Sequence, residues 1–198
     1  MIIEGIITTE DDHGNMHVAP IGPHVDELLQ SWVLKPFKTS TTFANLVRSN
    51  RGVFHVVDDS LLLVRAVLGY SNRVGHQPAA RLYDEIGWVL TDACRAFPLR
   101  VSHWDTQKER AEAICQVGKS IELRAFWGWN RAVHSLIELS VLWSRRHLMD
   151  IEELCGEFQR HRIIVHKTAG AREIAALSLL EDALGESIDG VRTFRGGQ

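Results

Sequence analysis

The sequence predicts an α+β fold in which a small antiparallel β-barrel precedes a helical C-terminal cap. The length of 198 residues fits one domain with a sub-domain packed on it. The first two thirds of the chain show the two-residue alternation of strands, and from about residue 130 the apolar residues recur with a helical period. We therefore expect a barrel domain at residues 1–125 and a helical sub-domain at residues 126–198.

The composition is that of an ordinary globular protein, with 45% hydrophobic and 24% charged residues. The 22 basic and 25 acidic side chains give a net charge of −3, which argues against a general nucleic-acid binder. No apolar run approaches the roughly 20 residues of a membrane span, and the start MIIEGIITTEDD lacks a basic signal region. Three separated cysteines form no CxxC pair, so we expect neither a zinc knuckle nor a redox motif. A cytoplasmic address follows.

A β-hairpin is expected at the N-terminus. Residues 2–9 are rich in β-branched side chains, residues 10–15 have turn composition, and residues 16–21 form the returning strand. Further along, the pattern predicts a short strand at 33–37, a helix at 41–51 that stops at Gly52, a buried strand at 53–57, and a short helix from Asp59 or Ser60 to Leu68 that Gly69 closes.

The spacing of apolar residues differs between the middle of the chain, where it is typical of strands, and the end, where it is typical of helices. Residues 70–87 are expected to form an irregular loop. Two long strands are expected around 88–101 and 110–124, and Gly118 in the second predicts a bulge or a barrel corner. Three helices should follow, from Asn130 to His147, from about 150 to 165, and from the break at 168–170 to a stop at Gly185, with a frayed tail at 193–198.

A run of hydroxyl side chains stands directly before the helix expected at residue 41. The unpaired N–H groups of a helix start attract anions such as phosphate. Hydroxyls of Ser40, Thr41 and Thr42 would add donors, and Lys38 or Lys35 would supply a full positive charge. The alternative is that one hydroxyl only caps the helix.

Small residues mark the hairpin strands. Thr8 and Thr9 precede the turn that contains Asn15, and Ala19-Pro20-Ile21-Gly22 follows it. A strand of this kind exposes backbone polar groups that suit the edge of a flat ring. The alternative is a tight hairpin in which these residues serve only the turn and the strand edge.

The order TT…GNxxxAPIG, then KxSTTxxNL, then VFHVVDD resembles the FMN-binding split barrels of the flavin reductase and pyridoxamine-phosphate oxidase superfamily. More narrowly, the chain resembles an archaeal and bacterial family of unknown function, through the NRA start at 130–132 and KTAG at 167–170. The resemblance implies a split barrel, bound FMN, and a homodimer with the flavin at the subunit interface. It places the phosphate on Ser40, Thr41 and Thr42 and the ring near Ala19, Pro20 and Ile21. The full expected cofactor set is Thr8, Thr9, Asn15, Ala19, Pro20, Ile21, Lys38, Ser40, Thr41, Thr42 and Asn45.

A possible substrate face lies on the helix that starts at Asn130. Arg131, His134 and Glu138 recur at helical spacing, so they could bind an anionic or heterocyclic small molecule above the flavin. The alternative is an ionic network that ties the helices to the barrel. His134 and Glu138 lack a third ligand, so no metal is expected. Trp127 and Trp129 would wall a pocket or pack in the core.

The resemblance, together with the hydroxyl-rich helix start, thus implies an FMN-dependent oxidoreductase acting on an unidentified small molecule. Flavin chemistry belongs to the cofactor, so no side chain is named as catalytic. Two alternatives stay open. One is a non-catalytic flavin-binding or sensing module, and the other is a barrel without cofactor that serves as an interaction protein.

Overall fold

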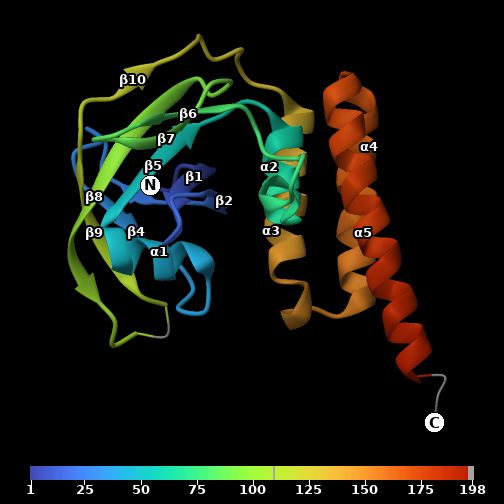
Figure 1. Ribbon diagram of the computed structural model, residues 1–198. Helices are drawn as coiled ribbons and strands as arrows, with labels where there is room; N and C mark the ends of the chain where they lie inside the picture. Colours follow the sequence, from blue (N-terminus) through green and yellow to red (C-terminus); the bar gives the residue numbers. More distant parts are fainter. Residues whose placement is uncertain (109, 196–198) are drawn as a thin grey trace. The chain divides into compact units, whose positions relative to one another are not determined.

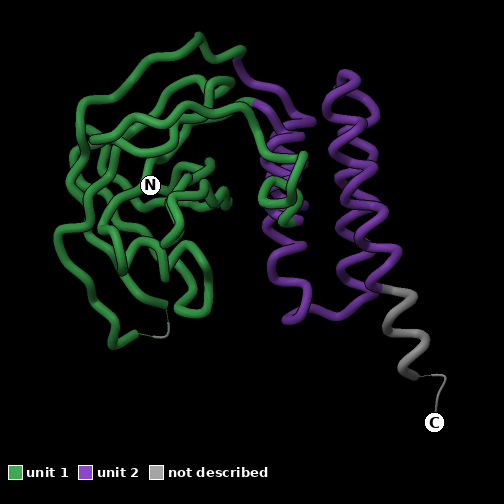
Figure 2. Tube along the Cα trace, viewed as in Figure 1, with its two compact units in different colours: residues 1–58, 69–127 green, residues 59–68, 128–198 purple. Residues whose placement is uncertain are grey.

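The computed structural model describes the backbone of residues 1–108 and 110–195. The chain forms two compact units, one of residues 1–58 and 69–127 and the other of residues 59–68 and 128–198 (Figure 2). The first unit is an antiparallel curled sheet, and the second is helical, which confirms the predicted α+β fold. The helical unit also takes in residues 59–68, which the sequence analysis assigned to the barrel.

The main sheet of the barrel unit is antiparallel and curls on itself (Figure 1). Its strands follow the order β2-β1-β5-β8-β9-β4-β3, and β10 pairs separately with β8. A bridge between Ile2 and His24 brings β3 back to the segment that precedes β1, so the curl nearly closes. The strands are β1 (Gly5–Glu10), β2 (Met16–Ile21), β3 (His24–Val25), β4 (Trp32–Leu34), β5 (Arg51–Val56), β8 (Arg95–Asp105), β9 (Glu112–Val117) and β10 (Ile121–Glu122).

The predicted hairpin is confirmed, with Ile7 opposite Ala19 in the β1–β2 ladder. Its turn is held by the Asp11 carboxylate, which accepts the backbone N–H groups of His13 (2.9 Å) and Asn15 (2.8 Å). Gly14 takes a positive φ of 81°, a conformation that glycine adopts without steric cost. The turn chemistry is therefore local, which is why the sequence predicted it.

The barrel core is aromatic at its centre. Trp32 lies 5.0 Å from Phe97 and 5.2 Å from Phe54 between ring centroids, and all three are buried. Helix α1 (Thr41–Ser49) adds Leu46 to this core and so covers the end at which β5 begins. Its stop is Asn50 in the left-handed conformation, not Gly52 as predicted. Gly52 lies within β5, where an added Cβ would come within 3.2 Å of Leu46.

The predictions for residues 70–124 need correction. The expected loop contains a 3-10 turn at Tyr70–Asn72 and strand β6 (Ala80–Tyr83), which pairs with β7 (Gly87–Leu90). Residues 88–101 do not form one strand, because the chain turns between β7 and β8. The expected strand at 110–124 ends at Val117 and resumes as β10. Gly118 lies in the break between β9 and β10, as a corner of the barrel would, and a separate register shift of the β8–β9 ladder falls between Val101 and His103.

The helical unit contains α2 (Ser60–Val67), α3 (Arg131–Ser144), α4 (Ile151–Thr168) and α5 (Ala171–Arg195), with a 3-10 turn at Arg146–Leu148. Asp59, Asn130 and Asp150 cap the first three of these helices with their side chains. The predicted stop at Gly185 is wrong, because α5 continues to Arg195. Part of the expected tail, residues 196–198, lies outside the described residues. The core of this unit gathers Val64, Leu136, Leu139, Phe158, Leu177 and Leu180.

Within the described part of the chain, no helix is both long enough and apolar enough to cross a membrane.

Candidate functional site

The start of α1 carries the predicted hydroxyl run. Ser40 is the N-cap: its Oγ accepts the N–H of Phe43 (3.1 Å) and donates to the carbonyl of Phe37 (2.7 Å). The capping alternative is therefore realised for Ser40. Its side chain still lies at the helix start, and one lone pair of its oxygen is left for another donor.

The first turn of α1 offers further donors. In the described structure, the N–H groups of Thr41 and Thr42 have no acceptor, as expected for the first residues of a helix. Thr41 is exposed, whereas Thr42 is buried at 4% exposure. Lys38 is exposed and its Nζ donates to the carbonyl of Thr106 (2.8 Å), while Lys35 pairs with Glu112 (3.0 Å). This end of the helix thus combines unpaired N–H groups, hydroxyls and one nearby cation, and acidic residues are absent from its first turn.

A buried polar contact ties α1 to the hairpin. Asn45 Nδ2 donates to Thr9 Oγ1 (3.0 Å), and both residues are buried. Thr8 points to the opposite face of β1, as strand alternation requires, and its hydroxyl donates to the carbonyls of Trp88 and Val53. The structure therefore brings Thr9 and Asn45 together, and it leaves Thr8 on the other face with its hydroxyl used.

Strand β2 forms the edge of the sheet. The side chain of Asn72 bonds both backbone groups of Val18, its Oδ1 accepting the N–H (2.7 Å) and its Nδ2 donating to the carbonyl (2.8 Å). Because outward and inward backbone groups alternate along an antiparallel strand, the Pro20 carbonyl also points away from β1. Pro20 is exposed, whereas Ala19 and Ile21 pack partly against the barrel core. The edge of β2 thus presents one outward-pointing hydrogen-bond acceptor, the carbonyl of Pro20. Pro20 itself has no N–H to donate.

Two predicted positions near this edge differ in environment. Asn15 is exposed in the turn, where its Nδ2 donates to Asp11 Oδ2 (3.0 Å). His17 lies opposite Thr9 in the ladder, and partial burial lowers the pKa of its imidazole. The side chain of Asn15 is therefore used within the turn. His17, which lies beside Thr9, was not among the residues expected to bind the cofactor.

The predicted substrate residues lie in the helical unit. Arg131, His134 and Glu138 are all exposed on α3, and no ion pair joins them in the described part of the unit. His134 instead stacks on Trp129, with ring centroids 5.3 Å apart. Trp127 and Trp129 are 89% and 85% exposed, so neither packs in a core.

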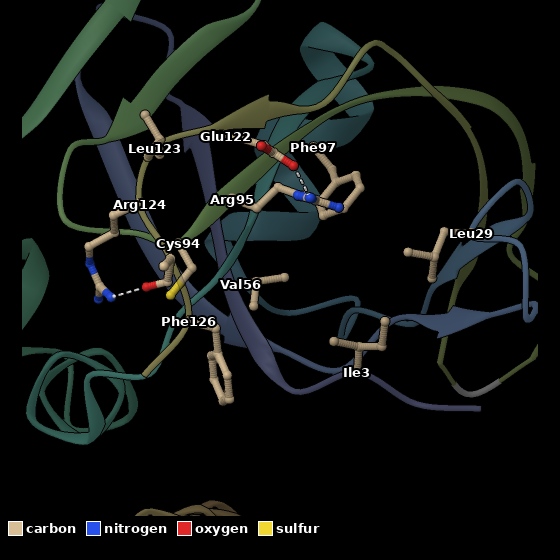
Figure 3. A pocket seen from close by; sticks show the side chains of 11 residues that line it. Ile3, Leu29, Val56, Cys94, Arg95, Phe97, Glu122, Leu123, Arg124 and Phe126 are labelled. Carbon is tan, nitrogen blue, oxygen red and sulfur yellow. Dashed lines mark hydrogen bonds and ion pairs between the residues drawn. The ribbon is translucent and has the colours of Figure 1, made fainter. Parts of the chain in front are cut away.

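A cavity that the sequence analysis missed opens at the other end of the barrel (Figure 3). Its volume is about 580 Å³, within the range of small-molecule sites. It lies where β5 ends, opposite the end covered by α1, because α1 directly precedes the start of β5. The lining comprises Ile3, Leu29, Val56, Phe97, Leu123 and Phe126, with Cys94, Arg95, Glu122, Arg124 and Ala125.

One wall of this cavity is fixed by a partly buried ion pair. Arg124 binds the Asp58 carboxylate through both terminal nitrogens, Nη1 to Oδ2 at 2.9 Å, and Asp58 also accepts the N–H of Trp127 (2.9 Å). The Arg124 guanidinium lowers the pKa of Asp58 to about 2. Burial and the nearby Asp58 charge raise the pKa of the Cys94 thiol, which favours an unreactive neutral thiol. No local pattern predicts this pair, since its members are 66 positions apart.

The fold and the donor-rich helix start define an α+β split-barrel protein with a helical C-terminal unit. The comparison with family models makes this specific. Residues 3–124 match the model described as "Protein of unknown function (DUF447) N-terminal domain", and residues 130–182 match "Protein of unknown function (DUF447)". The chain belongs to the DUF447 family, which confirms the resemblance drawn from the sequence. No curated protein matches the chain.

Solved structures support the same fold. An FMN-bound protein of the DUF447 family from Methanosarcina mazei is 21% identical, with a TM-score of 0.79 over 92% of this chain and 95% of that chain. An FMN-binding protein from Thermus thermophilus with bound 1-cyclohex-2-enone is 11% identical, with a TM-score of 0.50 over 61% and 70% of the two chains. Nitrilotriacetate monooxygenase component B from Mycobacterium thermoresistibile is 17% identical, with a TM-score of 0.50 over 60% and 69%. At these identities the likeness establishes the fold alone.

Proposed function

We propose that the protein binds FMN with its phosphate at the start of α1 and acts as an oxidoreductase on a small molecule. The observation that carries the proposal is the first turn of α1, where two N–H groups have no acceptor in the described structure and a hydroxyl of Thr41 is exposed beside them. The FMN-bound member of the same family from Methanosarcina mazei supports the choice of anion.

The donor set fits a phosphate group. A helix start favours negative charge, and hydrogen bonds from N–H and hydroxyl groups to an anion are stronger than neutral ones. Lys38 adds a cation on the exposed side, and the absence of acidic residues in the first turn of α1 avoids repulsion. The N–H groups of Thr41 and Thr42 and the hydroxyl of Thr41 would hold the phosphate, while Ser40 caps the helix beside it and Asn45 fixes α1 to Thr9 on β1.

The ring is proposed to lie along the edge of β2. There the outward carbonyl of Pro20 can accept a hydrogen bond from a ring N–H, and the small side chain of Ala19 permits close approach. Thr8 and Asn15 are left out of the revised set because their polar groups are used within the barrel. Bound FMN supplies hydride transfer, and the residues of this chain bind it, orient it and shield it from water.

The proposal includes a homodimer with the flavin at the interface. The edge of β2 supports it, because a site on an edge strand of one unit is open on one side and a second copy can cover it. We also propose a cytoplasmic location, supported by three free cysteines in the chain. Sedimentation with and without FMN tests the dimer, and fractionation of cells tests the location.

The phosphate site is tested with two substitutions at Ser40. Ser40→Asn and Ser40→Asp both preserve a helix cap, but only the second adds a negative charge beside the phosphate. We expect Ser40→Asn to bind FMN within about threefold of the natural protein, and Ser40→Asp to bind at least about tenfold more weakly. The measurement is quenching of flavin fluorescence on titration.

Riboflavin, which lacks the phosphate, is the matched ligand control. Its affinity should be the same for the two variants, because it places no charge at the start of α1. Equal FMN affinity in the two variants would contradict the phosphate site, as would an equal loss for riboflavin. Redox activity is tested by adding NADH or NADPH to the FMN-loaded protein without oxygen. Bleaching of the flavin absorbance supports the oxidoreductase, and an unchanged spectrum supports the non-catalytic flavin-binding module instead.

A further inference from the structure

We infer that the cavity at the end of β5 is a second binding site, which takes a flat apolar molecule carrying one carboxylate. The inference concerns the end of the barrel opposite α1, and it does not depend on FMN binding. We call this site the barrel-end cavity. Its lining residues are Ile3, Leu29, Val56, Cys94, Arg95, Phe97 and Glu122 to Phe126 (Figure 3).

The walls of the barrel-end cavity are mostly apolar. Val56 lies at its centre in Figure 3, with Ile3 and Leu29 on one side and Phe97 and Phe126 on others. Phe126 is 46% exposed, although a side chain of this size is favoured in contact with other apolar groups. With about 580 Å³ of space, the cavity can hold a fused pair of aromatic rings against these side chains.

Leu29 is placed in this wall at a conformational cost. Its φ of 56° lies in the left-handed region, which a branched side chain rarely adopts. The surrounding loop enforces the conformation: Asp26 accepts the N–H groups of Gln30 (2.7 Å) and Ser31 (3.0 Å), and the carbonyl of Leu29 accepts Trp32 Nε1 (2.8 Å). The loop thus holds an apolar side chain toward the cavity, which agrees with an apolar ligand.

The two arginines of the cavity differ in availability. Arg124 is committed to Asp58, whose side chain is only 7% exposed and which also holds the N–H of Trp127. Arg95 pairs instead with Glu122 on the two-residue strand β10, and the Glu122 side chain is 75% exposed. A pair of this exposed kind contributes little to stability, so a ligand carboxylate can displace Glu122 from Arg95.

The charges of the site also exclude other ligand classes. A cationic ligand would face two guanidinium groups against one lining carboxylate, that of Glu122. A dianion would need a second cation, and the other lining arginine, Arg124, is already bound to Asp58. A neutral molecule would leave the Arg95–Glu122 pair unchanged and gain only apolar contact. One carboxylate on a flat apolar body therefore matches both the aromatic wall and the single recruitable cation, Arg95, whose Cζ lies 6.0 Å from the Phe97 ring centroid.

The test uses 2-naphthoate as the probe, with 2-naphthalenemethanol as a neutral molecule of the same shape. Calorimetric titration of the full chain should give tighter binding of the naphthoate. Arg95→Gln should weaken naphthoate binding about tenfold or more and leave naphthalenemethanol binding unchanged. Glu122→Gln should strengthen naphthoate binding, because it removes the competing carboxylate. Arg81→Gln, at an exposed position on β6, is the matched control and should change neither affinity.

Several results would overturn the inference. These are no binding of naphthoate at millimolar concentration, the same affinity in Arg95→Gln as in the natural protein, or displacement of naphthoate by saturating FMN, which would assign the cavity to the flavin. The Ser40→Asp variant separates the two proposals, since it should lose FMN and still bind naphthoate. A protein that binds naphthoate through Arg95 but never FMN would sustain this site and refute the proposed function.

Discussion

The partly buried pair of Asp58 and Arg124 makes a measurable prediction about stability. Replacing Asp58 with Asn keeps the size of the side chain but removes the negative charge that binds the Arg124 guanidinium. The hydrogen bond from the Trp127 N–H to this side chain also becomes weaker, because the acceptor is no longer charged. The pKa of Asp58 falls from 3.8 to about 2 in the folded protein. Since one pKa unit corresponds to about 1.4 kcal/mol, the ionised carboxylate stabilises the fold by about 2 kcal/mol near pH 7.

The sign of the pH dependence follows from the direction of this shift. A carboxylate with a lowered folded pKa contributes its full stability above pH 4 and loses it as the pH falls toward 2. The difference in unfolding free energy between the natural protein and Asp58→Asn should therefore be about 2 kcal/mol at pH 7 and roughly a third of that at pH 2.5. Urea unfolding followed by tryptophan fluorescence measures it.

A matched control is the exposed pair of Glu157 and Arg160 on α4, in which the arginine side chain is 75% exposed. Glu157→Gln should cost less than about 0.5 kcal/mol at either pH. If Asp58→Asn cost no more than this control, or if its effect were the same at pH 7 and pH 2.5, the assignment of Asp58 as a charged residue that anchors Arg124 would be refuted.

Two further predictions concern the core of the barrel and the helices. His55 is fully buried, its Nε2 accepts the N–H of Leu90 (3.1 Å), and burial lowers its pKa to about 4. Because the unfolded chain binds a proton near pH 6.5 and the folded one does not, the natural protein should lose about 2 to 3 kcal/mol between pH 7.5 and 4.5 relative to His55→Gln, as measured by urea unfolding; parallel pH profiles would contradict this. An added Cβ at Gly5 would lie 2.5 Å from the His55 carbonyl oxygen, whereas one at Gly156 in α4 meets nothing within 4 Å. Gly5→Ala should therefore cost about 1 to 3 kcal/mol and Gly156→Ala should add about 0.5 to 1 kcal/mol, and thermal shifts of the same sign in the two variants would show the packing argument to be wrong.

What could be predicted from the sequence was governed by local chemistry. The hairpin at the N-terminus, the Ser40 cap and the breaks between helices depend on residues within about five positions of one another. The stop at Gly185 failed because one glycine costs a helix only about 1 kcal/mol, which the packing of α5 outweighs.

The features that escaped prediction depend on distant contacts. The Asp58–Arg124 pair, and with it a wall of the barrel-end cavity, joins segments that no periodicity relates. The face of Arg131, His134 and Glu138 was correctly placed on a helix, but nothing in its spacing indicated that these charges would remain separate and exposed. For the candidate phosphate site, the helix start was predictable, whereas the opposite orientations of Thr8 and Thr9 required the observed register of β1.

The position of α2 limits how this gene could be divided. A polypeptide ending at residue 127 would retain residues 59–68 but lack α3 and α5, against which Val64 and its neighbours pack. In such a product the apolar side chains of α2, which interrupts the barrel sequence, would be exposed to water. We expect this exposed apolar surface to promote self-association. Producing the barrel unit alone therefore requires replacing α2 with a polar linker. Because α2 belongs to the helical unit, the boundary between the two units is not a single point in the sequence.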